Sequence, residues 1–204
     1  MLDHLFDLGF APVIRVDKAG DDSAASVDDV SLGQKLRAIV GSSVAGGGVR
    51  TGSINGMGLN AIFSDPVGLA IDQDANLLYV ADQGHHLIRQ IDLEDTSVTT
   101  LAGTLDEPDA FDGTGDDASF DAPAQIAFQD GTLYVADVGN HAIRQINIST
   151  AEVTTVVGTL GVSGGSGQRV LPLEQARLYF AAGVAVAPDG LFLTADEALM
   201  FATP

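Results

Sequence analysis

Cysteine and tryptophan are absent from this chain of 204 residues, and basic residues are scarce. Without cysteine, the chain forms no disulfide framework and no cysteine-ligated metal or redox site. Only 6% of the residues are aromatic, so the core has to be built from Ala, Val, Ile and Leu. No apolar run approaches the roughly 18–20 residues that a membrane-spanning helix needs. Disulfide-stapled scaffolds and helical membrane spans are therefore excluded.

The charge balance is strongly acidic, with 28 Asp and Glu against 9 Lys and Arg and a formal net charge of −19. Binding to nucleic acid needs clustered Lys and Arg, which neutralise phosphates and release counterions. After position 50 the basic residues are only Arg89, Arg144, Arg169 and Arg177. Nucleic acid and anionic membrane surfaces are therefore excluded as expected partners, and the charge indicates solubility.

Hydrophobic residues make up 46% of the chain, which is typical of a globular domain, and they recur with a long period. The segment 78–82 (LYVAD) returns at 133–137, and 88–91 (IRQI) returns at 143–146. A third segment, 98–103, matches 153–158 at the same offset of 55 residues. Short apolar runs that repeat at this spacing are typical of propeller blades.

Each repeat is predicted to hold four short strands, because its apolar runs last about five residues and are rich in Val, Ile, Leu, Tyr and Thr. Gly, Asn, Asp and Ser fill the gaps, as turns require. The first two runs of a repeat lack apolar–polar alternation, which favours a sheet buried between two neighbours. The predicted strands are 67–71, 77–81, 87–91 and 98–102, then 124–128, 133–136, 142–146 and 153–157.

Partial copies flank the two full ones. Residues 183–186 and 191–195 resemble the first two strands of a third copy, and 13–17 and 36–41 resemble the last two strands of an earlier one. The fold class is therefore predicted as all-β, an incomplete propeller ring of half a blade, two full blades and half a blade. The corresponding segments are 1–41 with a loop insertion, 42–104, 105–158, and 159–204 as linker and partial blade.

Two segments carry a resemblance to the NHL-repeat family, namely 82–89 (DQGHHLIR) and 137–144 (DVGNHAIR). The flanking segments 63–70 (FSDPVGLA) and 112–123 (DGTGDDASFDAP) support it, and the likeness extends over about residues 36–196. It implies a β-propeller, commonly with six blades. The family includes ligand- and protein-binding sensors, RNA-binding propellers and a few metal-dependent lyases. The third copy departs from the pattern, because 196–200 (DEALM) lacks both the Gly and the His.

The repeated polar positions are predicted to be structural, because a catalytic or metal site normally uses a set of residues that occurs once. Asp side chains can accept backbone N–H groups in the turn, and Gly84 and Gly139 are expected to supply permissive φ angles there. The two arginines are expected to pair with carboxylates of the same or the next blade. These positions are Asp82, His86, Arg89, Asp137, His141 and Arg144.

No catalytic residue is assigned, and no metal site. Zinc needs three or four convergent ligands, and calcium prefers clustered oxygens. The four histidines leave zinc open and the acidic linker 106–121 leaves calcium open, although a solvated connection between blades is the favoured interpretation of the linker. Arg169 and Arg177, in the linker before the last copy, are the candidate residues for an anionic ligand.

The sequence therefore predicts a scaffold that binds a protein or small molecule through its inter-blade loops, without catalysis of its own. The alternative is a piece of a propeller enzyme, a metal-dependent lyase or hydrolase. Three blades do not close a ring, so either flanking sequence or a second copy is expected to complete it, and a fragment is favoured. The start has no signal-peptide pattern, and no compartment is assigned.

Overall fold

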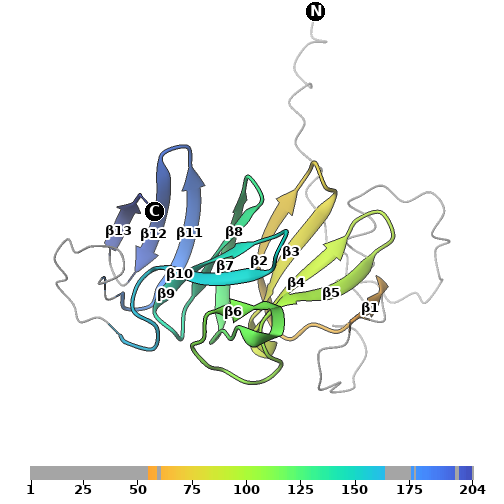
Figure 1. The fold of residues 1–204 in the computed structure, drawn as a ribbon, viewed down its shortest axis with the longest axis horizontal. Coiled ribbons are helices and arrows are strands. Elements are labelled where there is room, and N and C mark those ends of the chain that lie inside the picture. Colours follow the sequence, from red (N-terminus) through yellow and green to blue (C-terminus); the bar gives the residue numbers. More distant parts are fainter. Residues whose placement is uncertain (1–54, 59–60, 164–175, 177, 196–197, 204) are drawn as a thin grey trace, which may run out of the picture.

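The structure is a computed structural model that describes residues 55–58, 61–163, 176, 178–195 and 198–203. The predicted strands at 13–17 and 36–41 lie outside the described residues, and so does the predicted loop insertion. The described part is built from three antiparallel sheets, which fan out side by side in chain order (Figure 1). Its short helical elements include two single 3-10 turns, η3 (Gln83–His85) and η4 (Gly115–Asp117).

The first two sheets have the same topology, because each is a four-stranded meander with one short extra strand at its outer edge. The strand orders are β1-β5-β4-β3-β2 and β6-β10-β9-β8-β7. The strands of the first sheet are β1 (Gly56–Met57), β2 (Pro66–Asp72), β3 (Leu77–Asp82), β4 (Leu87–Asp92) and β5 (Ser97–Ala102). Those of the second are β6 (Gly113–Thr114), β7 (Pro123–Gln129), β8 (Thr132–Asp137), β9 (Ala142–Asn147) and β10 (Glu152–Val157).

The third sheet contains one strand more than predicted. It consists of β11 (Ala181–Ala187), β12 (Gly190–Ala195) and β13 (Ala198–Ala202), in that order. The NHL-like turn signature is missing before β13, so sequence reasoning ended the copy after two strands. The strand forms nonetheless, because Leu199 and Phe201 pair in register with Thr194 and Phe192 of β12.

The hairpin turns follow from local side-chain chemistry. Asp72 Oδ1 accepts the N–H groups of Asp74 and Ala75 at 3.1 and 3.0 Å, and Asn147 Oδ1 does the same for Ser149 and Thr150 in the second sheet. Such Asx turns reverse the chain between strands without a glycine.

Neighbouring sheets pack through their innermost strands, since β2 contacts β7 and β7 contacts β11. A Cβ at Gly68 would collide with the carbonyl oxygen of Ala124, so only glycine permits this approach of β2 to β7. Tyr79 of the first sheet contacts Phe128 of the second, with 5.6 Å between their ring centroids. Buried apolar side chains fill both junctions, which is the radial stacking of a propeller.

Among the described residues, no helix is long and apolar enough to cross a membrane.

Candidate functional site

The first repeated site is a buried ion pair in the first sheet. Arg89 on β4 reaches Asp82 at the end of the neighbouring strand β3, and its Nη1 donates to Asp82 Oδ2 at 2.9 Å. Its Nη2 donates to Asn55 Oδ1 at 2.9 Å, and its guanidinium lies 5.1 Å from the centre of the Phe63 ring. Both charged side chains are 0% exposed. Such a pair holds the turn after β3 against the segment that enters β2.

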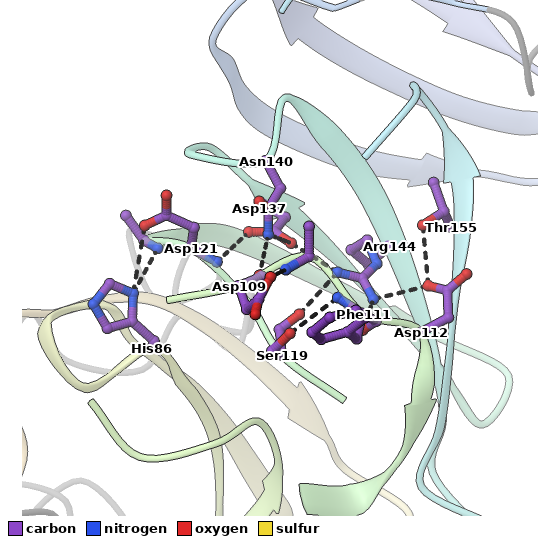
Figure 2. Close-up of polar contacts among 12 residues, drawn as sticks. His86, Asp109, Phe111, Asp112, Ser119, Asp121, Asp137, Asn140, Arg144 and Thr155 are labelled. Atoms are coloured by element: carbon purple, nitrogen blue, oxygen red, sulfur yellow. Dashed lines mark hydrogen bonds and ion pairs between the residues drawn. The ribbon is translucent and has the colours of Figure 1, made fainter. Parts of the chain in front are cut away.

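The second sheet repeats this arrangement with a different set of charges (Figure 2). Arg144 Nη1 donates to Asp137 Oδ2 at 2.9 Å, and its Nη2 donates to Asp112 Oδ1 at 2.8 Å. Backbone carbonyls of Phe111 and Ser119 accept from the same guanidinium at 2.7 and 3.0 Å. A carboxylate thus stands at 112 where the first sheet has the neutral amide of Asn55.

Each buried aspartate is held by further donors. Asp82 Oδ1 accepts the backbone N–H of Ser64 at 2.7 Å, and Asp137 Oδ1 accepts that of Asp121 at 2.8 Å. The aspartates therefore accept backbone N–H groups as expected, but from the segment before β2 or β7 and not from their own turn.

The residue three positions after each aspartate differs between the sheets. His85 Nδ1 lies 3.0 Å from Asp82 Oδ2. Asn140 Nδ2 donates to Asp137 Oδ2 at 2.9 Å and also to the Asp109 carbonyl at 2.7 Å. The asparagine therefore connects its turn to the acidic linker as well.

The two repeated histidines face the next sheet. The N–H of Ala122 donates to Nδ1 of His86 at 3.0 Å, and the N–H of Phe180 donates to Nδ1 of His141 at 3.3 Å. An Nδ1 that accepts a hydrogen bond carries no proton, so this contact requires the neutral ring. Asp121 Oδ1 also lies 3.6 Å from His86 Nδ1. These histidines link one blade to the next.

The predicted role of the turn glycines is wrong. Neither Gly84 nor Gly139 has a positive φ; the left-handed conformation falls instead on His86 and His141, at φ 59° and 55°. The glycines are required by space, because a Cβ at Gly84 would collide with Ser64 and one at Gly139 with Asp121. The two glycines were correctly identified from the sequence as necessary, but the reason is the lack of room for a Cβ and not the φ angle.

Burial and charge act in opposite directions on these ion pairs. Burial raises the pKa of Asp137 to about 6, against the lowering effects of Arg144, Asn140 and the N–H of Asp121. In the first sheet, burial lowers the pKa of Arg89, and Asp82 opposes the change. At Asp137 and at Arg89, the effect of burial on the pKa therefore exceeds that of the partner charge.

The other residues considered for ligand or metal binding do not form a site among the described residues. Arg169 and Arg177, proposed for an anionic ligand, lie outside the described residues, as does His4. Within the described part of the chain, no three His, Asp or Glu side chains come together in a way that could hold a metal ion. In the acidic linker, Asp112 binds Arg144 and Thr155.

Sequence reasoning missed Asn55 and Asp112 as partners of the arginines. Both stand before a Gly-x-Gly segment, at 56–58 and 113–115, which is the signal that could have found them. They lie 57 residues apart, not 55, because the turn between β2 and β3 (73–76) is two residues longer than the turn between β7 and β8 (130–131). A search at one fixed offset therefore passes over them.

Comparison with known proteins agrees with this geometry. The sequence profile of one family, described as NHL repeat, matches residues 63–91. NHL repeat-containing protein 2 of Bos taurus is 36% identical over 105 residues, which cover 50% of this chain and 14% of that protein. Protein SUPPRESSOR OF QUENCHING 1, chloroplastic, of Arabidopsis thaliana is 36% identical over 142 residues, 66% of this chain and 13% of that protein. The match thus spans about one seventh of the length of these relatives.

Among solved structures, an auxiliary nutrient binding protein from Bacteroides thetaiotaomicron superposes with a TM-score of 0.52 at 23% identity. The match covers 61% of this chain and 33% of that one. At this identity the likeness shows the fold alone, and it confirms the predicted class of stacked four-stranded blades.

Proposed function

This chain belongs to the NHL-repeat family, and from that premise we propose that it forms part of a propeller scaffold that binds a protein or a small-molecule ligand through its inter-blade loops. In this proposal the chain carries no catalysis of its own. The observation that supports it most is that the repeated polar side chains are buried and already paired. Asp82, Arg89, Asp137 and Arg144 are fully buried and bond to one another and to the backbone.

We propose that these four side chains, with His86 and His141, serve the architecture of the blades. A catalytic group has to reach substrate, and a side chain that is 0% exposed and already paired does not. The loops between the sheets are exposed and differ from one repeat to the next. Recognition residues on a rigid scaffold are expected at such positions.

The outer faces of the described part support a longer ring. Leu69 on β2 is 57% exposed, whereas Ile126, at the corresponding place on β7, is 4% exposed because the first sheet covers it. Phe192 and Phe201 form a second exposed apolar face on the third sheet. We propose that further blades of the same kind cover both faces, supplied by additional sequence of the same chain or by a second copy.

Metal content with turnover and ligand binding test the function, and sedimentation tests the assembly. Stoichiometric zinc or calcium in the purified chain, together with turnover that is lost on substitution of residues in these blades, would support the alternative of a metal-dependent propeller enzyme and overturn the scaffold. Binding of a peptide or metabolite that shifts loop resonances in NMR spectra, without turnover, supports the scaffold. Sedimentation of the wild type beside Leu69→Lys shows whether a second copy covers the exposed face, since the charge would prevent that contact.

A further inference from the structure

Four exposed apolar side chains stand on segments that contact the turn that follows β8. Phe111 is 59% exposed, Phe180 is 56% exposed, and Tyr179 and Val162 are exposed as well. We call these four residues the aromatic patch. Aromatic side chains that stay in solvent on a small soluble protein are typical of interaction sites.

Contacts bring the segments that carry these residues to the same turn. The Gly161 N–H donates to the Asn140 carbonyl at 3.2 Å, which sets Val162 beside the turn. The Asp109 carbonyl accepts from Asn140 Nδ2, which brings the segment before Phe111 to the same turn. The Tyr179 ring stacks on His141 of that turn, with centroids 5.9 Å apart and planes inclined by 10°.

The equivalent turn of the first sheet has no such patch. There the Asp106 N–H donates to the His85 carbonyl, which makes Glu107 the counterpart of Val162. Asp121 and Ala122 stand where the next junction has Tyr179 and Phe180, since Ala122 and Phe180 both donate to the preceding histidine. The blade fold therefore forms equally well with polar or small residues at these places.

The backbone at Phe180 gives a second reason to look beyond packing. Phe180 has φ 54°, in the left-handed region, as Ala122 has at the same place with φ 50°. A bulky residue in this conformation is strained, by about 1–3 kcal/mol. Burial does not offset this cost, because more than half of the ring is exposed.

Charge indicates the partner. Asp109 lies exposed beside this turn, since its carbonyl accepts from Asn140 Nδ2, the chain carries a formal net charge of −19, and the two arginines of the described residues are buried. We propose that the aromatic patch docks a short polypeptide segment that carries Lys or Arg next to an apolar anchor residue. The cations would face Asp109 and the rings, and the anchor would cover the apolar surface. This inference rests on the proposed scaffold function.

The experiment measures fluorescence anisotropy of labelled peptides of equal length on the full chain. One peptide combines Lys and Arg with Phe and Leu, a second keeps only the basic residues, and a third combines Glu with Phe and Leu. The test variant is Tyr179→Asp with Phe180→Ala, which introduces the residues of the first junction. The matched control is Leu199→Ser, which removes an exposed apolar side chain from the third sheet.

The peptide that combines Lys and Arg with Phe and Leu, the basic–aromatic peptide, should bind best. Its affinity should fall about tenfold or more in the test variant, whose thermal midpoint should stay that of the wild type. The Leu199→Ser control should bind the peptide as the wild type does. Equal affinity in wild type and test variant would overturn the docking proposal, and so would binding of the Glu peptide as tight as that of the basic–aromatic peptide. Selection of peptides from a random library on the wild type separates the two proposals. Enrichment of sequences that are not basic, or no enrichment and no peptide binding, overturns the docking proposal and leaves the scaffold, whereas metal-dependent turnover that is lost on substitution of residues in these blades overturns the scaffold.

Discussion

The first two sheets share the geometry of the buried Asp–Arg pair but differ in the charges of the side chains around it. In the first, the buried pair of Asp82 and Arg89 is completed by His85 and by the neutral Asn55. In the second, a neutral Asn140 stands beside Asp137, and the extra charge is the carboxylate of Asp112. The positions of the arginine and the aspartate are fixed by the blade, whereas the residues around them vary.

The surroundings of the two turns differ more than the turns themselves. Carboxylates and Ala122 surround the first, and the aromatic patch surrounds the second. A repeat fold thus separates two kinds of residue: those that recur because the blade needs them, and those that occur once because packing leaves them free to change. The comparison can be broken or sharpened by substitutions at matched positions.

The largest effect is expected from removal of a buried arginine. Arg144→Met leaves the Asp137 carboxylate buried without its cation, and Arg89→Met does the same to Asp82. Each should lower the free energy of unfolding by about 3–5 kcal/mol, measured by urea denaturation at neutral pH. A loss below about 1 kcal/mol in either variant would contradict the equivalence of the two sites.

A pH effect is expected from Asp137. Its pKa is raised to about 6 by burial, whereas an unfolded chain has a value near 3.8. Between these values the folded state binds the extra proton, so the contribution of Asp137 to stability grows as pH falls from 6 towards 4 and is lost as pH rises through 6.

The Asp137→Asn variant provides the reference for this effect. Urea midpoints of wild type and variant are compared across pH 4 to 7, and the wild type should gain relative to the variant on acidification by about 1–3 kcal/mol. A difference that does not change with pH, or one of opposite sign, would show that the ion pair with Arg144 outweighs desolvation.

How much the sequence predicts depends on how local the cause is. The four longer strands of each of the first two sheets follow from apolar runs and turn residues, and they were predicted to within one or two residues, whereas the two-residue edge strands β1 and β6 were not predicted. The repeat offset also selects Asp82, Arg89 and their counterparts. Contacts made by Ser64 and Asp121 depend on where a distant segment returns, so no spacing rule finds them. The steric need at Gly84 and Gly139 arises in the same way.

A smaller effect is expected from exchange of the residues beside the aspartates. His85→Asn should change stability by only about 0.5 kcal/mol, because asparagine fills the equivalent position in the second sheet. Asn140→His should cost about 1 kcal/mol, because Asn140 donates to both Asp137 and Asp109 and a histidine ring replaces only one of these bonds. Equal costs for the two exchanges, from thermal denaturation, would contradict this asymmetry.

The smallest effect at neutral pH is expected at Tyr79. Its hydroxyl is buried and has no hydrogen-bond partner among the described residues, and desolvation, aided by Asp72, raises its pKa to about 12. Tyr79→Phe should therefore be neutral or stabilise by less than about 0.5 kcal/mol at pH 7. An ultraviolet titration should lose the tyrosinate step near pH 12. Loss of more than about 1 kcal/mol would show that the hydroxyl has a partner.

The coupling energy between Asp137 and Arg144, from a double-mutant cycle with Asp137→Asn, Arg144→Met and the combined variant, tests the architectural role of the repeated pair most directly. The sum of the two single-variant losses in unfolding free energy should exceed the loss in the double variant by about 2 kcal/mol or more. Affinity for the basic–aromatic peptide should stay unchanged. Coupling near zero, or a folded variant that no longer binds the peptide, would contradict the division between residues that hold the blades and residues that recognise a partner.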